Sequence, residues 1–149
     1  MRKKVLVVDD EYTIRELVDL SLSPDYEVIK AENGKEALKK AQDKPNLIIL
    51  DIMMPKMDGY EVCERIKSDK RTKDIPVLML TAKHTIDDLK EAIKVDADEY
   101  ITKPFEPDLL KRRVDAYLSP RKRNRKVERK LFQFGKSLHY IKEREDIPS

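Results

Sequence analysis

Three short runs of consecutive apolar residues stand out along the chain. Each run lacks the alternation of a half-exposed strand, and an uninterrupted run of this length is typical of a strand covered on both faces. Weaker strand patterns at 26–31 and 99–102 suit the edges of the same sheet. The three apolar runs are Val5–Val8, Leu47–Leu50 and Val77–Leu80.

Apolar residues at helical spacing follow each of the five expected strands. Proline and glycine residues fall between the elements, where they interrupt both patterns. The order is strand and then helix, five times over. This order predicts an α/β fold with a doubly wound, five-stranded parallel sheet and helices on both of its faces. The helical patterns centre on Ile14–Leu22, Ala37–Ala41, Val62–Ile66, Ile86–Ile93 and Leu110–Tyr117.

The strand and helix pattern ends at Ser119 and Pro120, and a basic run follows at 121–126. Beyond it, apolar residues recur in steps of four and three, the spacing of a coiled-coil seam. We therefore expect a domain at 1–119 and a basic, helical C-terminal extension at 120–149. The extension would pack on the domain, pair with a second copy or lead into an output region. Its apolar series is Val127, Leu131, Phe134, Leu138 and Ile141.

The composition narrows the class of protein. The chain has 149 residues, of which 41% are charged and 40% hydrophobic. The lone Cys63 excludes an internal disulfide framework and a cysteine-rich metal site. No apolar run approaches the roughly 20 residues of a membrane span, and the first run is too short for a signal peptide. We expect a soluble, cytoplasmic protein without membrane contacts.

The charge is divided unevenly along the chain. Residues 121–149 hold ten Lys/Arg and four Asp/Glu, a net +6, whereas residues 1–120 hold 22 basic and 25 acidic residues, a net −3. The basic run could contact nucleic-acid phosphates by charge alone. No recognition helix or aromatic stacking platform accompanies it, so DNA is not an expected partner. The alternative that stays open is a truncated or minimal DNA-binding output regulator that uses the basic tail.

Polar residues stand at the carboxyl ends of four expected strands: Asp9 and Asp10, Asp51, Thr81 and Lys103. In an open parallel sheet these ends meet at the edge where ligands bind. Grouped carboxylates favour a divalent cation, and oxygen-only ligands suit Mg²⁺. The lysine ammonium and the threonine hydroxyl supply a positive charge and a donor for phosphoryl oxygens. These residues predict magnesium-assisted phosphoryl chemistry at this edge.

Four segments, in order and at these spacings, resemble the receiver domain of two-component response regulators, over residues 3–118. The resemblance implies a chemotaxis-receiver-like fold, that is, a flavodoxin-like (βα)5 domain with strand order 2-1-3-4-5. The segments are Val-Leu-Val-Val-Asp-Asp-Glu (5–11), Leu-Ile-Ile-Leu-Asp-Ile-Met-Met-Pro-Lys-Met-Asp-Gly (47–59), Pro-Val-Leu-Met-Leu-Thr-Ala (76–82) and Asp-Glu-Tyr-Ile-Thr-Lys-Pro-Phe (98–105).

The resemblance also implies a ligand set. Asp51 resembles the phosphoacceptor nucleophile. Asp10 and Asp51 resemble direct Mg²⁺ ligands, Asp9 helps through water, and the backbone carbonyl of Met53 completes the protein ligands. Met53 and Lys83 occupy positions that flank the water path to the acyl phosphate.

The signalling residues are implied in the same way. Thr81 resembles the switch hydroxyl, Lys103 the phosphate-binding lysine, and Tyr100 the aromatic residue that turns inward when Thr81 moves toward the phosphate. The Lys103–Pro104 peptide bond is expected to be cis. Asp96 departs from the family, which often has glycine at this position, but aspartate tolerates a positive φ better than most residues.

Two further residues have ordinary interpretations. Cys63 is expected to be a small core residue of the third helix. His84 is expected to be solvated and is not a phosphodonor histidine, because that residue belongs to the partner.

The resemblance implies a function as a phosphoryl acceptor. The phosphoryl group would come from a sensor histidine kinase or a phosphotransfer protein. The receiver would then act on a downstream protein through its fourth helix, fifth strand and fifth helix, or form a homodimer through that face or the C-terminal helix. A phosphatase with an aspartate nucleophile shares the chemistry, but no Asp-x-Asp follows an expected strand. We expect no enzyme beyond Mg²⁺-dependent self-phosphorylation and autodephosphorylation.

Overall fold

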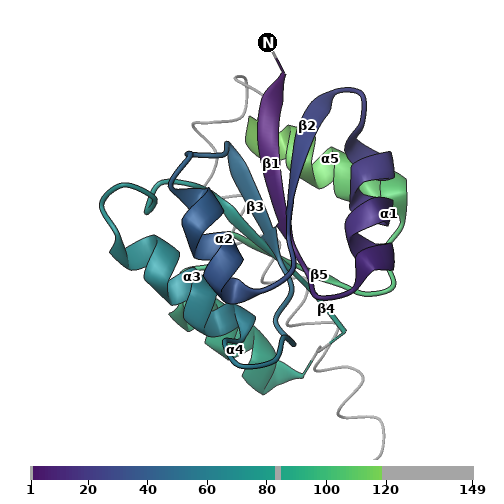
Figure 1. Cartoon of the computed structure of the whole chain (residues 1–149). Coiled ribbons are helices and arrows are strands. Elements are labelled where there is room, and N and C mark those ends of the chain that lie inside the picture. Colours follow the sequence, from purple (N-terminus) through teal and green to yellow (C-terminus); the bar gives the residue numbers. More distant parts are fainter. Residues whose placement is uncertain (1, 83–84, 119–149) are drawn as a thin grey trace, which may run out of the picture.

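The computed structural model describes residues 2–82 and 85–118, and Figure 1 shows their arrangement. Strands and helices alternate along the chain without exception in these residues. Their bounds are β1 Lys3–Val8, α1 Tyr12–Leu22, β2 Tyr26–Ala31, α2 Gly34–Ala41, β3 Leu47–Leu50, α3 Gly59–Ser68, β4 Val77–Thr81, α4 Ile86–Lys94, β5 Glu99–Thr102 and α5 Pro107–Leu118.

The five strands form one parallel sheet in the order β2-β1-β3-β4-β5. The two strands with the weaker sequence patterns, β2 and β5, are its edges, as expected. Helices α1 and α5 cover one face, and α2, α3 and α4 cover the other (Figure 1). The predicted α/β class, doubly wound layering and strand order are confirmed.

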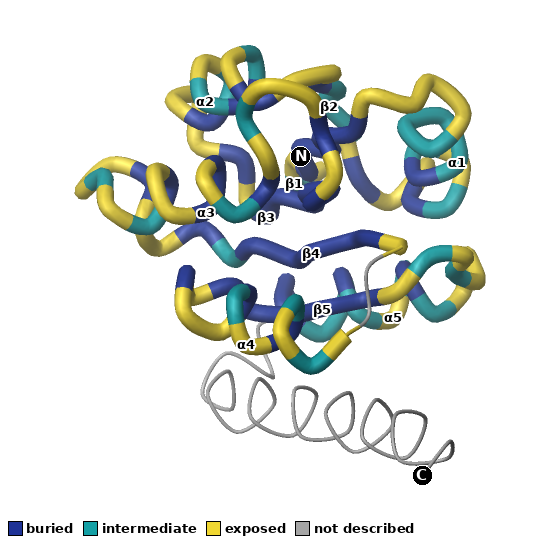
Figure 2. The backbone as a smooth tube through the Cα atoms, turned by 90° about the horizontal axis from the view of Figure 1, so that it is seen from below, coloured by how far each residue is buried: buried dark blue, intermediate teal, exposed yellow. Residues whose placement is uncertain are grey.

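Burial on both faces explains the uninterrupted apolar runs of the central strands. Along β1, Leu6 and Val8 face the core beneath α2, α3 and α4, whereas Val5 and Val7 face the core beneath α1 and α5. Strands β3 and β4 divide their side chains between the two cores in the same way. Because successive side chains of a strand point to opposite faces, only a strand with two buried faces needs apolar residues throughout. Figure 2 shows β4 buried along its length between the two layers.

Several local expectations can be compared with the backbone. The Lys103–Pro104 bond is cis, and Asp96 has a φ of 66°, in the left-handed region. The sequence analysis did not anticipate the cis bond at Ser23–Pro24 or the positive φ of 70° at Lys56. Cys63 is fully buried in α3, as expected.

Some expectations concern residues outside the described part of the chain. They are the helical extension within 120–149 and the interpretations of Lys83 and His84. Among the residues that are described, no helix is both long enough and apolar enough to cross a membrane.

Candidate functional site

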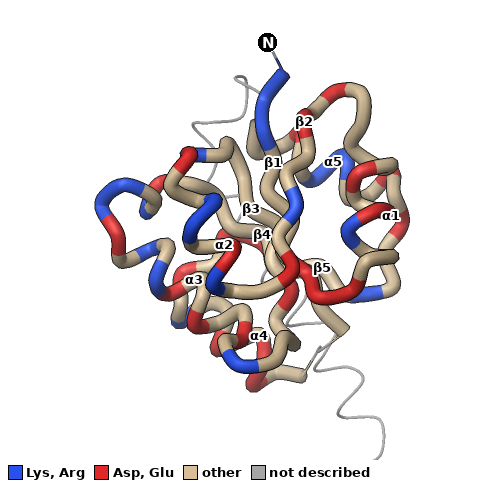
Figure 3. Tube along the Cα trace, in the orientation of Figure 1, with Lys and Arg blue, Asp and Glu red and all other residues tan. Residues whose placement is uncertain are grey.

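Three carboxylates meet at the carboxyl edge of the sheet. Val8 pairs with Leu50 at the ends of β1 and β3, so the residues that follow these strands lie side by side. The Asp51 amide donates to the Val8 carbonyl at 2.9 Å. Asp9, Asp10 and Asp51 each offer a carboxylate oxygen, and these oxygens all lie within 4.8 Å of one another. Figure 3 shows the acidic residues gathered in the loop after β1.

The lysine that follows β5 reaches into this cluster. The Lys103 ammonium donates to Asp9 Oδ2 at 2.8 Å and lies 3.5 Å from Asp51 Oδ1. It also lies 3.9 Å from the carboxylate of Glu11. The Lys103 backbone amide donates to the Thr81 carbonyl at 2.8 Å, which joins the ends of β4 and β5. The Lys103 ammonium is therefore shared among carboxylates that follow β1 and β3.

The remaining sequence-predicted residues lie around the cluster. Thr81 ends β4 and is fully buried, and Tyr100 is buried within β5 against the core beneath α4. Met53 is exposed, and its backbone amide donates to Asp51 Oδ1 at 3.3 Å. Asp9 and Asp51 are buried, whereas Asp10 is open to solvent. Two of the three carboxylates are thus buried in the protein, and that of Asp10 is the one open to solvent.

Arg15 is a site residue that the sequence analysis missed. Its guanidinium donates to the backbone carbonyl of Asp9 at 2.7 Å and lies 3.8 Å from the Glu32 carboxylate. The Glu11 amide donates to Asp9 Oδ1 at 2.9 Å. Together these contacts fix the corner between β1 and α1. No periodic pattern distinguishes Arg15 from an ordinary surface charge of a helix, so only tertiary structure reveals its role.

Burial and like charge oppose the ionisation of the cluster. Burial, and then the charge of Asp9, raises the pKa of Asp51 to about 6. Burial also raises the pKa of Asp9, although Lys103 acts against it. Burial lowers the pKa of Lys103, but its hydrogen bond to Asp9 and the charge of Asp51 together outweigh that effect, so this pKa is raised.

The donor set fits a magnesium ion. All three groups are carboxylates, the ligand type that Mg²⁺ prefers, and one of them is exposed, which leaves room for the waters this ion retains. The raised pKa values of Asp9 and Asp51 mean that burial disfavours the ionised carboxylates, which a nearby cation would stabilise. A divalent cation would stabilise the ionised carboxylates more than the single charge of Lys103 does.

Replacing Asp51 with Asn is expected to stabilise the magnesium-free protein at neutral pH by about 2 to 3 kcal/mol of unfolding free energy. The folded protein holds the Asp51 proton up to about pH 6, whereas the unfolded chain releases it near the ordinary value of 3.8. Between these values the folded state binds more protons, so wild-type stability falls as the pH rises. The Asn variant lacks this loss.

The measurement is urea unfolding of both proteins, with a chelator present, below about pH 4 and above about pH 7. The gain should vanish at the acidic pH, where Asp51 is protonated in both states. A gain of equal size at both pH values would show that the burial of a charge is not its cause.

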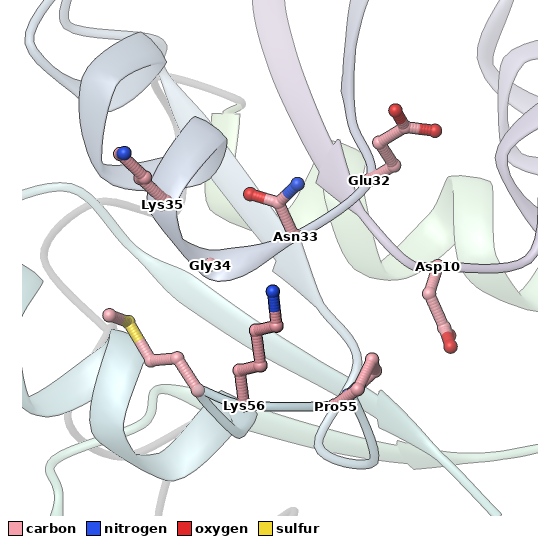
Figure 4. Close-up of a pocket in the computed structure, with 8 residues that line it drawn as sticks. Asp10, Glu32, Asn33, Gly34, Lys35, Pro55 and Lys56 are labelled. Atoms are coloured by element: carbon pink, nitrogen blue, oxygen red, sulfur yellow. The ribbon is translucent and has the colours of Figure 1, made fainter.

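A cavity of about 570 Å³ adjoins the acidic cluster. Asp10 lines one end, and the loops β2–α2 and β3–α3 form the walls. In Figure 4 the side chain of Lys56, a residue with positive φ, extends toward Asn33 across this space. The cavity thus meets the acidic cluster at Asp10, on the side of β2.

Comparisons with known proteins agree with this geometry. The family model described as "Response regulator receiver domain" matches residues 5–115. The chain therefore belongs to the response regulator receiver domain family, and the resemblance seen in the sequence is confirmed. It is 48% identical over 120 residues to the alkaline phosphatase synthesis transcriptional regulatory protein PhoP of Bacillus subtilis, which covers 79% of this chain and 49% of the relative.

Two further matches bear on the output. The chain is 44% identical over 117 residues to the DNA-binding dual master transcriptional regulator RpaA of Synechocystis, covering 77% of this chain and 48% of that protein. Chemotaxis protein CheY4 of Vibrio cholerae superimposes with a TM-score of 0.75 at 37% identity, covering 79% of this chain and 100% of that one. The chain spans about half the length of the curated relatives it matches. Because these relatives include DNA-binding regulators, the expectation that DNA is not a partner is not supported.

Proposed function

We propose that this chain accepts a phosphoryl group on Asp51 and changes conformation to control a partner. The observation that carries the proposal is the buried Asp51 carboxylate, grouped with Asp9 and Asp10 and 3.5 Å from the ammonium of Lys103. Belonging to the receiver family supports the same role. The donor would be a sensor histidine kinase or a phosphotransfer protein.

The transfer is a displacement at phosphorus. One oxygen of Asp51 forms the new bond to phosphorus while the bond between phosphorus and the donor's histidine nitrogen breaks, and that nitrogen keeps the electron pair. Asp10, Asp51 and the Met53 carbonyl would hold Mg²⁺, with Asp9 acting through water, and the ion would neutralise charge on the phosphoryl oxygens. Autodephosphorylation reverses the role of Asp51, which leaves when water attacks the phosphorus.

The protein's own groups then respond to the new charge. Lys103 lies between Asp9 and Asp51 and needs only a short movement to reach a phosphoryl oxygen. Thr81 would move its hydroxyl toward another oxygen, and the ring of Tyr100, which is already buried beneath α4 in this structure, would be held in that inward position. The phosphate shifts populations because its interactions differ between the two conformations. The response would reach a downstream protein, or a second copy, at the α4–β5–α5 face.

The test is the intact mass of the chain after incubation with a small acyl phosphate. A gain of one phosphoryl group is expected with Mg²⁺, and little or none with a chelator in its place. Uptake that is equally fast without a divalent ion would contradict the assigned ligand set.

A second candidate function is favoured by the names of the relatives: the receiver portion of a DNA-binding transcriptional regulator. Here the switch would act on an output region, and the basic run at 121–126 would add phosphate contacts. Binding of the chain to duplex DNA that weakens steeply with salt would support direct contact through this run. Binding that is absent at low salt would leave the protein partner as the output.

A further inference from the structure

The backbone carbonyl of Asp9 lies one residue beyond the paired part of β1. The registers of β1 with β2 and with β3 both end at Val8, and the Asp9 amide still donates to the Ala31 carbonyl at 3.1 Å. Neither of these two strands supplies a donor to the Asp9 carbonyl. The guanidinium of Arg15 supplies one from α1, at 2.7 Å. Arg15 therefore holds the chain at the point where the sheet ceases to hold it.

The Asp9 carbonyl is also the contact that fixes Arg15. The side chain of Arg15 is only 12% exposed, whereas that of Glu32, at 3.8 Å, is 64% exposed. An ion pair with a partner in solvent contributes little, but a hydrogen bond from a charged donor is among the stronger ones. The Tyr12 ring, whose centroid lies 5.8 Å from the guanidinium carbon, adds a second contact. The guanidinium is thus directed at the Asp9 carbonyl rather than at Glu32.

The direction of this carbonyl determines where the Asp10 side chain starts. The C=O of Asp9 and the N–H and Cα of Asp10 belong to one planar peptide unit. Among residues 2–82 and 85–118, no hydrogen bond or ion pair holds the Asp10 carboxylate itself. The carboxylates of Asp9 and Asp51, in contrast, are buried and lie 2.8 and 3.5 Å from the Lys103 ammonium. The position of Asp10 therefore depends on its backbone.

We propose that Arg15 is a positioning residue of the divalent-cation site, because its hydrogen bond to the Asp9 carbonyl fixes the peptide plane that places the Asp10 carboxylate. This inference rests on the proposed function and adds a residue that supports the ligands without contacting their carboxylates. Removing a group that orients a metal ligand typically lowers the affinity for the metal by about 10- to 100-fold. Arg15 should therefore determine how tightly Mg²⁺ binds and leave the phosphoryl transfer itself unchanged.

The variant Arg15→Met is the first test, because it keeps an unbranched side chain and removes the donor. The full chain, labelled with ¹⁵N, is titrated with Mg²⁺ alone and followed by NMR. We expect the dissociation constant of the variant to rise about tenfold. Loss of a positive charge would by itself strengthen the binding of a cation. The expected weakening is opposite to the charge effect, so it reports on position.

The rate of phosphoryl uptake separates positioning from a general disturbance. Intact mass gives the initial rate with a small acyl phosphate over a range of Mg²⁺ concentrations. The Arg15→Met variant should need about tenfold more Mg²⁺ to reach half of its maximal rate, and that maximal rate should match the wild type. A maximal rate that stays far below the wild type at saturating Mg²⁺ would contradict a role limited to placing Asp10.

Two control variants remove charges around the same site. Lys56→Gln removes a positive charge from the cavity that Asp10 also lines (Figure 4), and Glu32→Gln removes only the exposed ion pair of Arg15. Both should bind Mg²⁺ within about twofold of the wild type, well short of the loss of a ligand's support.

The outcomes distinguish this inference from the proposed function. Wild-type affinity for Mg²⁺ in Arg15→Met, or an equal loss in either control variant, overturns the role of Arg15 alone. A wild-type chain that does not bind Mg²⁺ overturns the assigned ligand set, and this inference with it.

Discussion

An Asp51→Asn variant is expected to take up no phosphoryl group from either an acyl phosphate or a kinase. A carboxamide lacks the charged oxygen that attacks phosphorus, and the neighbouring carboxylate of Asp9 is poorly placed to substitute. Asp9 is buried and engaged by Lys103 at 2.8 Å, so its oxygen is already committed. The measurement is intact mass after incubation with Mg²⁺, and near-complete uptake in the wild type is the reference.

Asp58→Asn is the matched control for this variant. Asp58 lies seven residues beyond Asp51 and caps α3, where its side chain accepts from the Glu61 amide at 3.0 Å. Asparagine caps a helix as well as aspartate does, so this variant should fold and take up the phosphoryl group normally. Labelling of the Asp51 variant at the wild-type rate would place the acceptor elsewhere, and loss in both variants would indicate a general disturbance of the β3–α3 loop.

The fold could be read from the sequence because the apolar pattern is strong where burial is complete. Strands β1, β3 and β4 are buried on both faces, and uninterrupted apolar runs mark all three. The edge strands have weaker patterns because β2 is partly exposed and β5 carries the polar residues Glu99 and Thr102. The position of the candidate site follows from the same pattern, since every parallel strand ends at one edge of the sheet.

The side-chain contacts could not be read in this way. Lys103 meets Asp9 across 94 residues of sequence, and Tyr60 meets Asp88 across 28. Arg15 looks like any other charged residue of an amphipathic helix. Such contacts depend on how the loops and helices are placed after packing, and no local pattern encodes them. Family resemblance named Lys103 because its segment matched, but it gave no reason to single out Arg15.

Gly59→Ala is expected to lower the unfolding free energy by about 3 kcal/mol or more. Gly59 begins α3 without a positive φ, so space and not backbone freedom requires glycine here. A Cβ atom at this position would lie 2.3 Å from the carbonyl oxygen of Asp51 and 2.7 Å from the Cα of Ile52. Both are backbone atoms, which cannot turn aside as the end of a side chain can. The corner that carries Asp51 must shift, so phosphoryl uptake should fall together with stability.

Gly34→Ala provides the comparison. A Cβ atom there would meet Cγ2 of Val62 at 2.8 Å and Sδ of Met57 at 2.9 Å; the methionine can move away, whereas the buried valine is stiffer and must shift with its surroundings. Both contacts are with side chains and alanine favours the helix that begins at Gly34, so the loss should be smaller than that of Gly59→Ala, about 1 to 2 kcal/mol. Urea unfolding measures both variants, and intact mass measures their uptake. If Gly59→Ala were as stable and as active as Gly34→Ala, close contact between α3 and the Asp51 backbone would not be what fixes the acceptor in place.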